Sequence, residues 1–171
     1  MLGRSITRIA NGTCGKARKV AVEEERESEM GNPTDVMRKK FAALNAQDAK
    51  EMTGYFSPEA EKEVPGGLLR GRDQIAAFVS VFWEAFPDLN FTVTSEVEEG
   101  PVVAIRGTMT GTHLGVFHTP AGDMPPTGRH IDLSFSDDYE LQGGVIVSTH
   151  LHLDRLELLE QLGAVPAPTP A

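Results

Sequence analysis

Side chains able to move protons gather near the end of the chain, where His150, His152 and Asp154 stand at alternate positions. A β-strand shows alternate residues to opposite faces, so a strand over 145–154 presents all three on one face. Imidazole and carboxylate groups within reach of one another are the equipment of general acid–base catalysis. We therefore expect this face to carry a site, with His150 among the residues that contact the substrate.

A second segment, 130–140, alternates in the same way and places Asp138 and Glu140 on its polar side. Gly143-Gly144 predicts a turn, and an antiparallel hairpin would bring the two carboxylates beside the histidines, as further substrate-binding groups. Another interpretation stays open, because alternating strands routinely present a solvated polar face to water.

A metal site is the less favoured use of His150, His152 and Asp154. Ligands on alternate residues of one strand are widely spaced for a tetrahedral site. The only cysteine, Cys14, excludes a multi-thiolate site and an intramolecular disulfide. We predict no metal and no cofactor.

Three helices must precede these strands. Met37, Phe41 and Leu44 recur at helical spacing, and Asp48 is a suitable cap for a short second helix. A third helix, capped at Asp73 and ended by Pro87, carries a longer apolar stripe, whose members are Ile75, Phe78, Val79, Phe82 and Phe86.

From residue 91 onward the pattern is that of four long strands, joined by turns or by a flexible loop over 115–128. No crossover helix separates these strands, so we expect an antiparallel sheet and an α+β fold. A curved sheet with the helices across its mouth would enclose a pocket. Phe82 and Trp83 would line its roof as substrate contacts, and His113 would lie at a strand end, fixing the loop or contacting substrate.

Composition bounds the function. The chain has 171 residues, 40% hydrophobic and 24% charged, and a net charge of −9. These values predict one globular domain and disfavour a nucleic-acid partner, which needs a basic face. No apolar run is long enough for a membrane span, and we expect a cytoplasmic protein. Residues 1–29 lack core-forming side chains and predict a disordered extension, with Met30 at its boundary, while 164–171 predicts a flexible Pro-rich tail.

Between 34 and 163 the order of several short motifs resembles the SnoaL-like polyketide cyclases, also called ester cyclases, of the nuclear-transport-factor-like superfamily. The segments that carry the resemblance are Asn45-Ala-Gln-Asp48, Gly71-Arg-Asp73, Ala85-Phe-Pro-Asp-Leu89, Gly111-Thr-His113, Pro125-Pro-Thr-Gly-Arg129 and Asp154 through Leu-Leu-Glu-Gln-Leu-Gly163. The resemblance implies a cone-shaped α+β barrel over 30–163.

The resemblance also implies a reaction. Members of the family use an aspartate at the end of the last strand as general acid/base in an intramolecular aldol ring closure, assisted by a histidine two residues earlier. Asp154 and His152 occupy those positions, whereas Asp138 and Glu140 stand where the family has a glutamine and a histidine. It further implies a hydrophobic, carbonyl-bearing small molecule as substrate, no cofactor and a homodimer.

Other functions fit the same fold. Isomerases, dehydratases and hydrolases share it. A ligand-binding or stress-associated protein that lost the chemistry would show a pocket closed by bulky side chains, or Asp154 turned outward. A structural domain that dimerises through its sheet is the remaining alternative.

Overall fold

A computed structural model describes residues 32–119 and 122–166. The expected extension over 1–29, the boundary at Met30 and the last five residues of the Pro-rich tail lie outside the described residues. The chain separates into two compact units, and the second unit, which begins at Pro33, contains the helices and strands described in the next paragraphs.

Three helices precede the long strands, as the apolar spacing predicts. They are α2 (Pro33–Asn45), α3 (Ala49–Gly54) and α4 (Gly71–Ala85). The expected cap of α3 is confirmed, since the Asp48 carboxylate accepts from the backbone N–H of Glu51 at 2.8 Å. Helix α4 begins at Gly71, so Asp73 lies in its first turn rather than at its cap. None of the described helices is long and apolar enough to cross a membrane.

Six strands form one sheet in the order β2-β1-β8-β7-β4-β3. Their bounds are β1 (Phe56–Val64), β2 (Gly67–Arg70), β3 (Asn90–Glu99), β4 (Val102–Thr112), β7 (His130–Gln142) and β8 (Val145–Leu153). The predicted α+β fold with a curved sheet is confirmed, and the four strands from residue 91 onward pair antiparallel as expected. The sheet as a whole is mixed and not closed, because β1 pairs in parallel with β8.

The local pattern predicts no strand in the range of β1 and β2, because Ser57-Pro58 is typical of a helix end and Pro65-Gly66-Gly67 is typical of a loop. The alternation of β1 is hidden by its composition: its buried positions are Phe56, Ala60, Lys62 and Val64, of which one is charged and one is small. The hairpin adds a parallel neighbour to the last strand of the chain.

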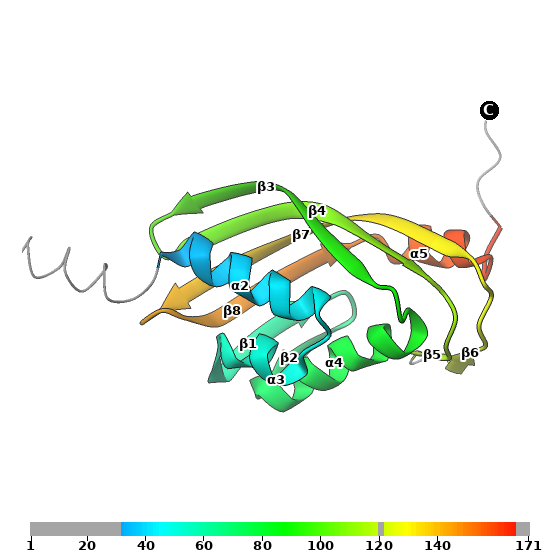
Figure 1. Ribbon diagram of the computed structural model, residues 1–171, viewed down its shortest axis with the longest axis horizontal. Coiled ribbons are helices and arrows are strands. Elements are labelled where there is room, and N and C mark those ends of the chain that lie inside the picture. The colour runs from blue at the N-terminus through cyan, green and yellow to red at the C-terminus, as the bar shows by residue number, and fades with distance from the viewer. Residues whose placement is uncertain (1–31, 120–121, 167–171) are drawn as a thin grey trace, which may run out of the picture. The chain divides into compact units, whose positions relative to one another are not determined.

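Figure 1 shows α2 and α4 on the same side of the curved sheet. The core lies between them and the sheet, where Phe41 of α2 stacks on Phe135 of β7 with ring centroids 6.1 Å apart. Phe91 of β3 meets Phe135 edge-on at 5.6 Å. This inner face of the sheet is therefore the one that any pocket enclosed by the helices must use.

Two smaller elements complete the unit. The loop over 115–128 contains a short hairpin of β5 (Phe117–Thr119) and β6 (Gly122–Met124). Its approach to α4 requires Gly115, whose backbone N–H donates to the Ala85 carbonyl at 3.0 Å and whose added Cβ would lie 1.9 Å from the Glu84 carbonyl oxygen. The final helix α5 (Arg155–Leu162) ends at Gly163, which adopts the left-handed conformation favoured by glycine at a helix C-terminus.

Asp154 is the N-cap of α5. Its carboxylate accepts from the backbone N–H groups of Leu156 at 2.8 Å and Glu157 at 3.0 Å. Replacing Asp154 with Ala leaves these donors unpaired and should lower the free energy of unfolding by about 1 kcal/mol, whereas Asn caps about as well as Asp and should change it little. Urea denaturation of both variants checks this, and equal losses in the two would contradict the capping role.

Candidate functional site

The histidines of β8 lie on the outer face of the sheet, away from the helices. His150 and His152 are exposed, whereas Thr149 is buried and Leu151 and Leu153 are half-buried against the core. The predicted hairpin does form, with Asp138 opposite His150 in the register of β7 and β8. The side chains were grouped correctly, but the face on which they lie does not look into the space under the helices.

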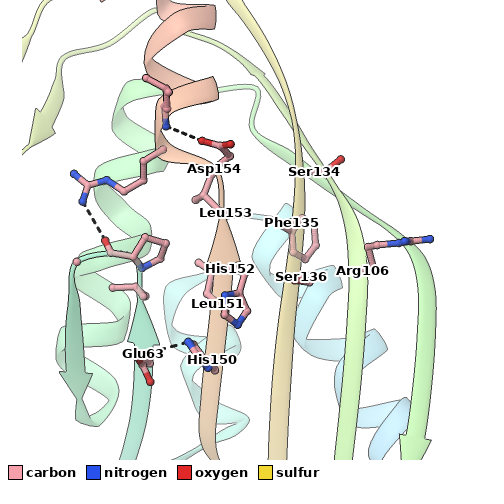
Figure 2. A pocket seen from close by; sticks show the side chains of 15 residues that line it. Glu63, Arg106, Ser134, Phe135, Ser136, His150, Leu151, His152, Leu153 and Asp154 are labelled. Atoms are coloured by element: carbon pink, nitrogen blue, oxygen red, sulfur yellow. Dashed lines mark hydrogen bonds and ion pairs between the residues drawn. The ribbon is translucent and has the colours of Figure 1, made fainter.

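An open groove of about 810 Å³ runs along this outer face. Figure 2 shows His150 and His152 side by side on β8, with ring centroids 4.1 Å apart, and Asp154 at the start of α5. His150 Nε2 lies 3.6 Å from a carboxylate oxygen of Glu63 on β1, and Arg106 borders the other side of the groove. Both histidines and Asp154 line the groove.

The remaining expected substrate contacts are dispersed. Asp138 and Glu140 are exposed on the outer face, where Glu140 accepts from the Ser148 hydroxyl at 3.3 Å. Phe82 does line an inner cavity, whereas Trp83 is half-buried and does not line the outer groove or the two inner cavities that contain Phe78. The structure therefore does not bring the six expected substrate-binding groups together around Asp154, and their contacts with a substrate stay predictions.

His113 fixes the loop, one of its two expected roles. It is fully buried, its Nδ1 lies 3.1 Å from the Thr127 hydroxyl, and the Thr127 backbone N–H donates to it at 3.2 Å. Burial lowers the pKa of the His113 imidazole, which keeps the ring neutral. A neutral, loop-bound ring is a structural element here.

The inner face carries a charged cluster that the sequence interpretation missed. Its members are Lys40 of α2, Lys62 of β1, Asp137 and Tyr139 of β7, and Thr149 of β8, all of them buried. They come from four elements and meet between α2 and the sheet. Buried charges are rare unless they are paired, so this cluster is the strongest functional candidate in the described residues.

Asp137 is the centre of the cluster. Its Oδ2 accepts from Lys62 Nζ at 2.8 Å and from the Tyr139 hydroxyl at 2.6 Å, and its Oδ1 accepts from the Thr149 hydroxyl. Lys62 also donates to Thr149 at 3.3 Å. Both carboxylate oxygens are therefore occupied, and Asp137 is a fixed anion rather than a free base.

Within the part of the chain that the structure describes, Lys40 joins this centre through Tyr139, to whose hydroxyl oxygen its amine donates at 2.8 Å. Burial and the Lys62 charge lower the pKa of the Lys40 amine to about 7, against the opposing effect of Asp137. Lys62 and the Asp137 carboxylate already balance in charge, so a protonated Lys40 would leave one unpaired positive charge in the interior.

The pKa values of the other two members fit this picture. Burial opposes ionisation of Asp137, but the Lys62 and Lys40 charges and the hydrogen bonds it accepts prevail and lower its pKa. Burial and the Asp137 charge raise the pKa of Tyr139 well above its usual value. Near neutral pH Asp137 is thus a carboxylate and Tyr139 a neutral phenol, while the Lys40 amine exchanges its proton readily.

Two small apolar cavities open beside the cluster. One of about 50 Å³ is lined by Lys40, Lys62, Asp137 and Tyr139 together with apolar side chains of α2, α3 and α4. A second of about 40 Å³ continues under α4 and is lined by Phe82. Phe78 and Val79 border both and are only half-buried, so the two cavities are separated from solvent by a few side chains of α4.

The sequence did contain a signal for this cluster. On the apolar side of β7, at odd positions 131 to 141, Asp137 is the one charged residue. The expected site instead uses Asp138 and Glu140, which lie on the polar side of the same strand. Lys40 likewise interrupts the apolar face of α2 between Met37 and Phe41. A single charge in an otherwise apolar period marks a buried ionic group.

A curved sheet with three helices across one face and a cavity beneath them defines the class of cone-shaped folds that hold small ligands. The model of the SnoaL-like polyketide cyclase family matches residues 34–162, and the chain belongs to this family. No curated protein matches the sequence.

Solved structures support the same fold. The proposed polyketide cyclase IdmH from Streptomyces antibioticus is 25% identical, with a TM-score of 0.65 and coverage of 78% of this chain and 99% of that one. A proposed SnoaL-like polyketide cyclase from Jannaschia sp. CCS1 is 22% identical, with a TM-score of 0.69 and coverage of 78% and 93%. The proposed hydroxylase AclR from Streptomyces galilaeus is 24% identical, with a TM-score of 0.68 and coverage of 80% and 84%.

Asp137 and Asp138 are adjacent on β7 but face opposite sides, which makes them a matched pair for testing the cluster. Asp137→Asn removes the charge that compensates Lys62 and should lower the free energy of unfolding by about 3–5 kcal/mol. Asp138→Asn changes an exposed side chain and should stay within about 0.5 kcal/mol of the parent. Chemical denaturation measures both, and similar effects would contradict the assignment of Asp137 as the interior charge.

The lowered pKa of Lys40 predicts that stability rises with pH above neutrality. Between the folded-state pKa of about 7 and the ordinary value of 10.5, the unfolded chain binds more protons at this position than the folded chain. The free energy of unfolding should therefore increase by up to about 1.4 kcal/mol per pH unit in this range. The raised pKa of Tyr139 opposes the rise once unfolded tyrosine begins to ionise, near pH 10.

Lys40→Met isolates this contribution, because Met retains the length of the side chain without the titrating amine. Urea denaturation from about pH 7 to 9.5 should show a smaller increase in stability for Lys40→Met than for the parent. The exposed neighbour Lys39, changed to Met, serves as control and should leave the increase intact. Identical pH profiles for the parent and Lys40→Met would show that Lys40 is protonated in both states.

Proposed function

We propose that the protein catalyses a cyclase-type proton transfer on a hydrophobic, carbonyl-bearing small molecule, in the space between α2, α4 and the sheet. Family membership supports a cyclase-type or related activity. The observation that carries the proposal is the buried Lys40 amine, whose pKa is lowered to about 7 beside an apolar cavity. A base with a pKa close to the working pH is the most effective one for proton transfer.

Lys40 takes the part that the family resemblance assigns to Asp154. Near neutrality about half of the Lys40 amines are uncharged and able to remove a hydrogen from the carbon next to a carbonyl. The same amine, once protonated, returns a proton to the oxygen after ring closure. Asp137 cannot share this work, since three donors occupy its carboxylate. Its part is to hold Lys62 and Tyr139 in position and to keep a negative charge near the amine.

A substrate can enter only if side chains of α4 move away from the cavities. Cavities of about 50 and 40 Å³ are smaller than a ring-forming substrate. Phe78, Val79 and Phe82 lie between the cavities and solvent and are half-buried, so their displacement would join the cavities into one channel that leads to Lys40. Aromatic walls suit an aromatic or polyene chain better than a sugar or a phosphate.

A second candidate function is the binding of a hydrophobic ligand without turnover. It is favoured by two features expected of such a protein, namely an interior filled by phenylalanine side chains and an Asp154 that caps α5 instead of facing the cavity. This candidate keeps the same cavity and the same class of ligand. The homodimer and the hydrophobic substrate stay predictions in both cases.

Exchange of carbon-bound hydrogen for deuterium in 2-heptanone tests the proposed function, because this narrow, apolar ketone needs less displacement of the α4 side chains than a ring-forming substrate. In deuterated buffer near neutral pH, the protein should accelerate loss of the hydrogens next to the carbonyl, as measured by NMR. Lys40→Met should reduce the acceleration by about 10²–10⁴-fold, the usual contribution of a general base. Lys39→Met should leave it unchanged.

Asp154→Asn distinguishes this proposal from the mechanism inferred from the family resemblance. If Asp154 is the base, its Asn variant loses the exchange and Lys40→Met keeps it. Binding of 2-heptanone with no acceleration of exchange in the parent protein would support the ligand-binding candidate instead.

A further inference from the structure

We propose that Lys40 acts as a nucleophile and forms a covalent iminium adduct with the ketone or aldehyde group of its ligand. The inference rests on the proposed function for the choice of a carbonyl ligand, and it assigns to Lys40 a bond to carbon beyond proton transfer. Four observations support it: the position of the amine, its hydrogen bonding, the rings around it, and the contrast with Lys62.

The Lys40 side chain is buried but forms part of a cavity wall. Its residue is 5% exposed, and it lines the 50 Å³ cavity together with Phe41 and Tyr139. A carbonyl group that enters this cavity meets the amine without leaving an apolar environment. Exclusion of bulk water favours an imine, because water reverses its formation.

The amine has a lone pair available when it is uncharged. The hydrogen bond found for Lys40 among the described residues is a donation to the Tyr139 oxygen, and the phenol proton is directed to Asp137. No proton donor of the cluster therefore points at the Lys40 nitrogen. Its lowered pKa makes the uncharged, nucleophilic form abundant near neutral pH.

The surrounding rings favour the cationic product. Lys40 Nζ lies 3.9 Å from the centroid of the Phe41 ring and 4.9 Å from that of Tyr139. An iminium nitrogen at the same place would keep these cation–π contacts, and its positive charge would be spread over carbon as well. The fixed Asp137 carboxylate, one hydrogen bond away through Tyr139, also stabilises a positive charge there.

Lys62 differs from Lys40 in that its amine contacts a carboxylate directly. It is buried to the same degree, yet its ammonium group donates to Asp137 at 2.8 Å and to Thr149 at 3.3 Å. These two contacts engage the Lys62 amine with an anion and a hydroxyl, whereas the Lys40 amine has no carboxylate within hydrogen-bond distance among the described residues. The cluster thus contains one lysine that supplies charge and one that is free to react.

Formation of the adduct releases one water molecule. The Lys40 nitrogen lone pair forms a bond to the carbonyl carbon, and the π-electron pair moves to the oxygen, which takes up a proton lost by the nitrogen. The carbon–oxygen bond of this carbinolamine then breaks, and water leaves with the second amine proton. The imine nitrogen takes one proton from solvent and becomes an iminium ion, which acidifies hydrogens on the adjacent carbon.

Reductive trapping tests the adduct. The full-length protein is incubated with 2-heptanone and sodium cyanoborohydride near pH 7, and the modified lysines are identified by site-resolved mass spectrometry. Exposed Lys39 and Lys50 serve as internal controls. We expect the heptan-2-yl group on Lys40 at least about 10-fold more often than on Lys39, because the lowered pKa of Lys40 makes its uncharged amine abundant near neutral pH.

Two variants complete the experiment. Lys40→Arg and Lys40→Met should abolish labelling at position 40 and leave the labelling of Lys39 and Lys50 unchanged. Labelling of Lys39 and Lys50 with none at Lys40 in the parent protein overturns the proposal.

The deuterium exchange described above, run in parallel, separates this inference from the proposed function. Exchange that depends on Lys40 but leaves no trapped adduct means that Lys40 acts only as a base, so the nucleophile is rejected and the proposed function stands. A trapped adduct without exchange supports the nucleophile and rejects catalysis of proton transfer. Neither signal overturns both.

Discussion

The Asp137 carboxylate is the interaction on which the interior depends, because it connects elements from the beginning, middle and end of the chain. It binds Lys62 of β1 and Thr149 of β8, and through Tyr139 it reaches Lys40 of α2. β1 and β8 are also the parallel pair of the sheet. When the β1–β2 hairpin pairs with β8, Lys62 therefore comes beside Asp137 and compensates its buried charge.

The buried cluster lowers the stability of the folded state but fixes the positions of its side chains. Burying two cations and one anion among phenylalanines is seldom better for stability than an apolar core of the same volume. The arrangement does place one amine at an apolar cavity with no carboxylate of its own, and that combination lowers its pKa to about 7. Groups with pKa values near neutrality in a cavity are more typical of functional sites than of structural ion pairs.

Most of the fold could be predicted from apolar periodicity. The three helices, the four long strands and the glycine-terminated last helix follow from local spacing. The β1–β2 hairpin could not be predicted in this way, since Lys62 and Ala60 fill two of its inward positions and its parallel pairing with β8 spans almost a hundred residues. Long-range pairing leaves little trace in a local pattern.

The site was harder to predict than the fold, because the pleat of a strand has two faces and the sequence does not label them. Polar side chains at 148, 150 and 152 of β8 and apolar ones at 147, 151 and 153 identify a two-faced strand. The apolar face packs under the helices, so polar exceptions to the apolar pattern mark the interior site. Asp137 and Thr149 are those exceptions.

A β-bulge further separates pattern from structure in β8. Glu140 pairs with Ser148 and Leu141 with Ile146, so Val147 is left without a partner and the alternation shifts by one residue. Ile146 is therefore buried before the bulge and Thr149 after it. Asp154 follows the last residue of β8 and lies on the outer face of the sheet. The donors next to its carboxylate are the backbone N–H groups of Leu156 and Glu157 at the start of α5. Its carboxylate satisfies them, so the capping role accounts for an aspartate at this position, and our proposal places the proton chemistry with the charges enclosed on the inner face.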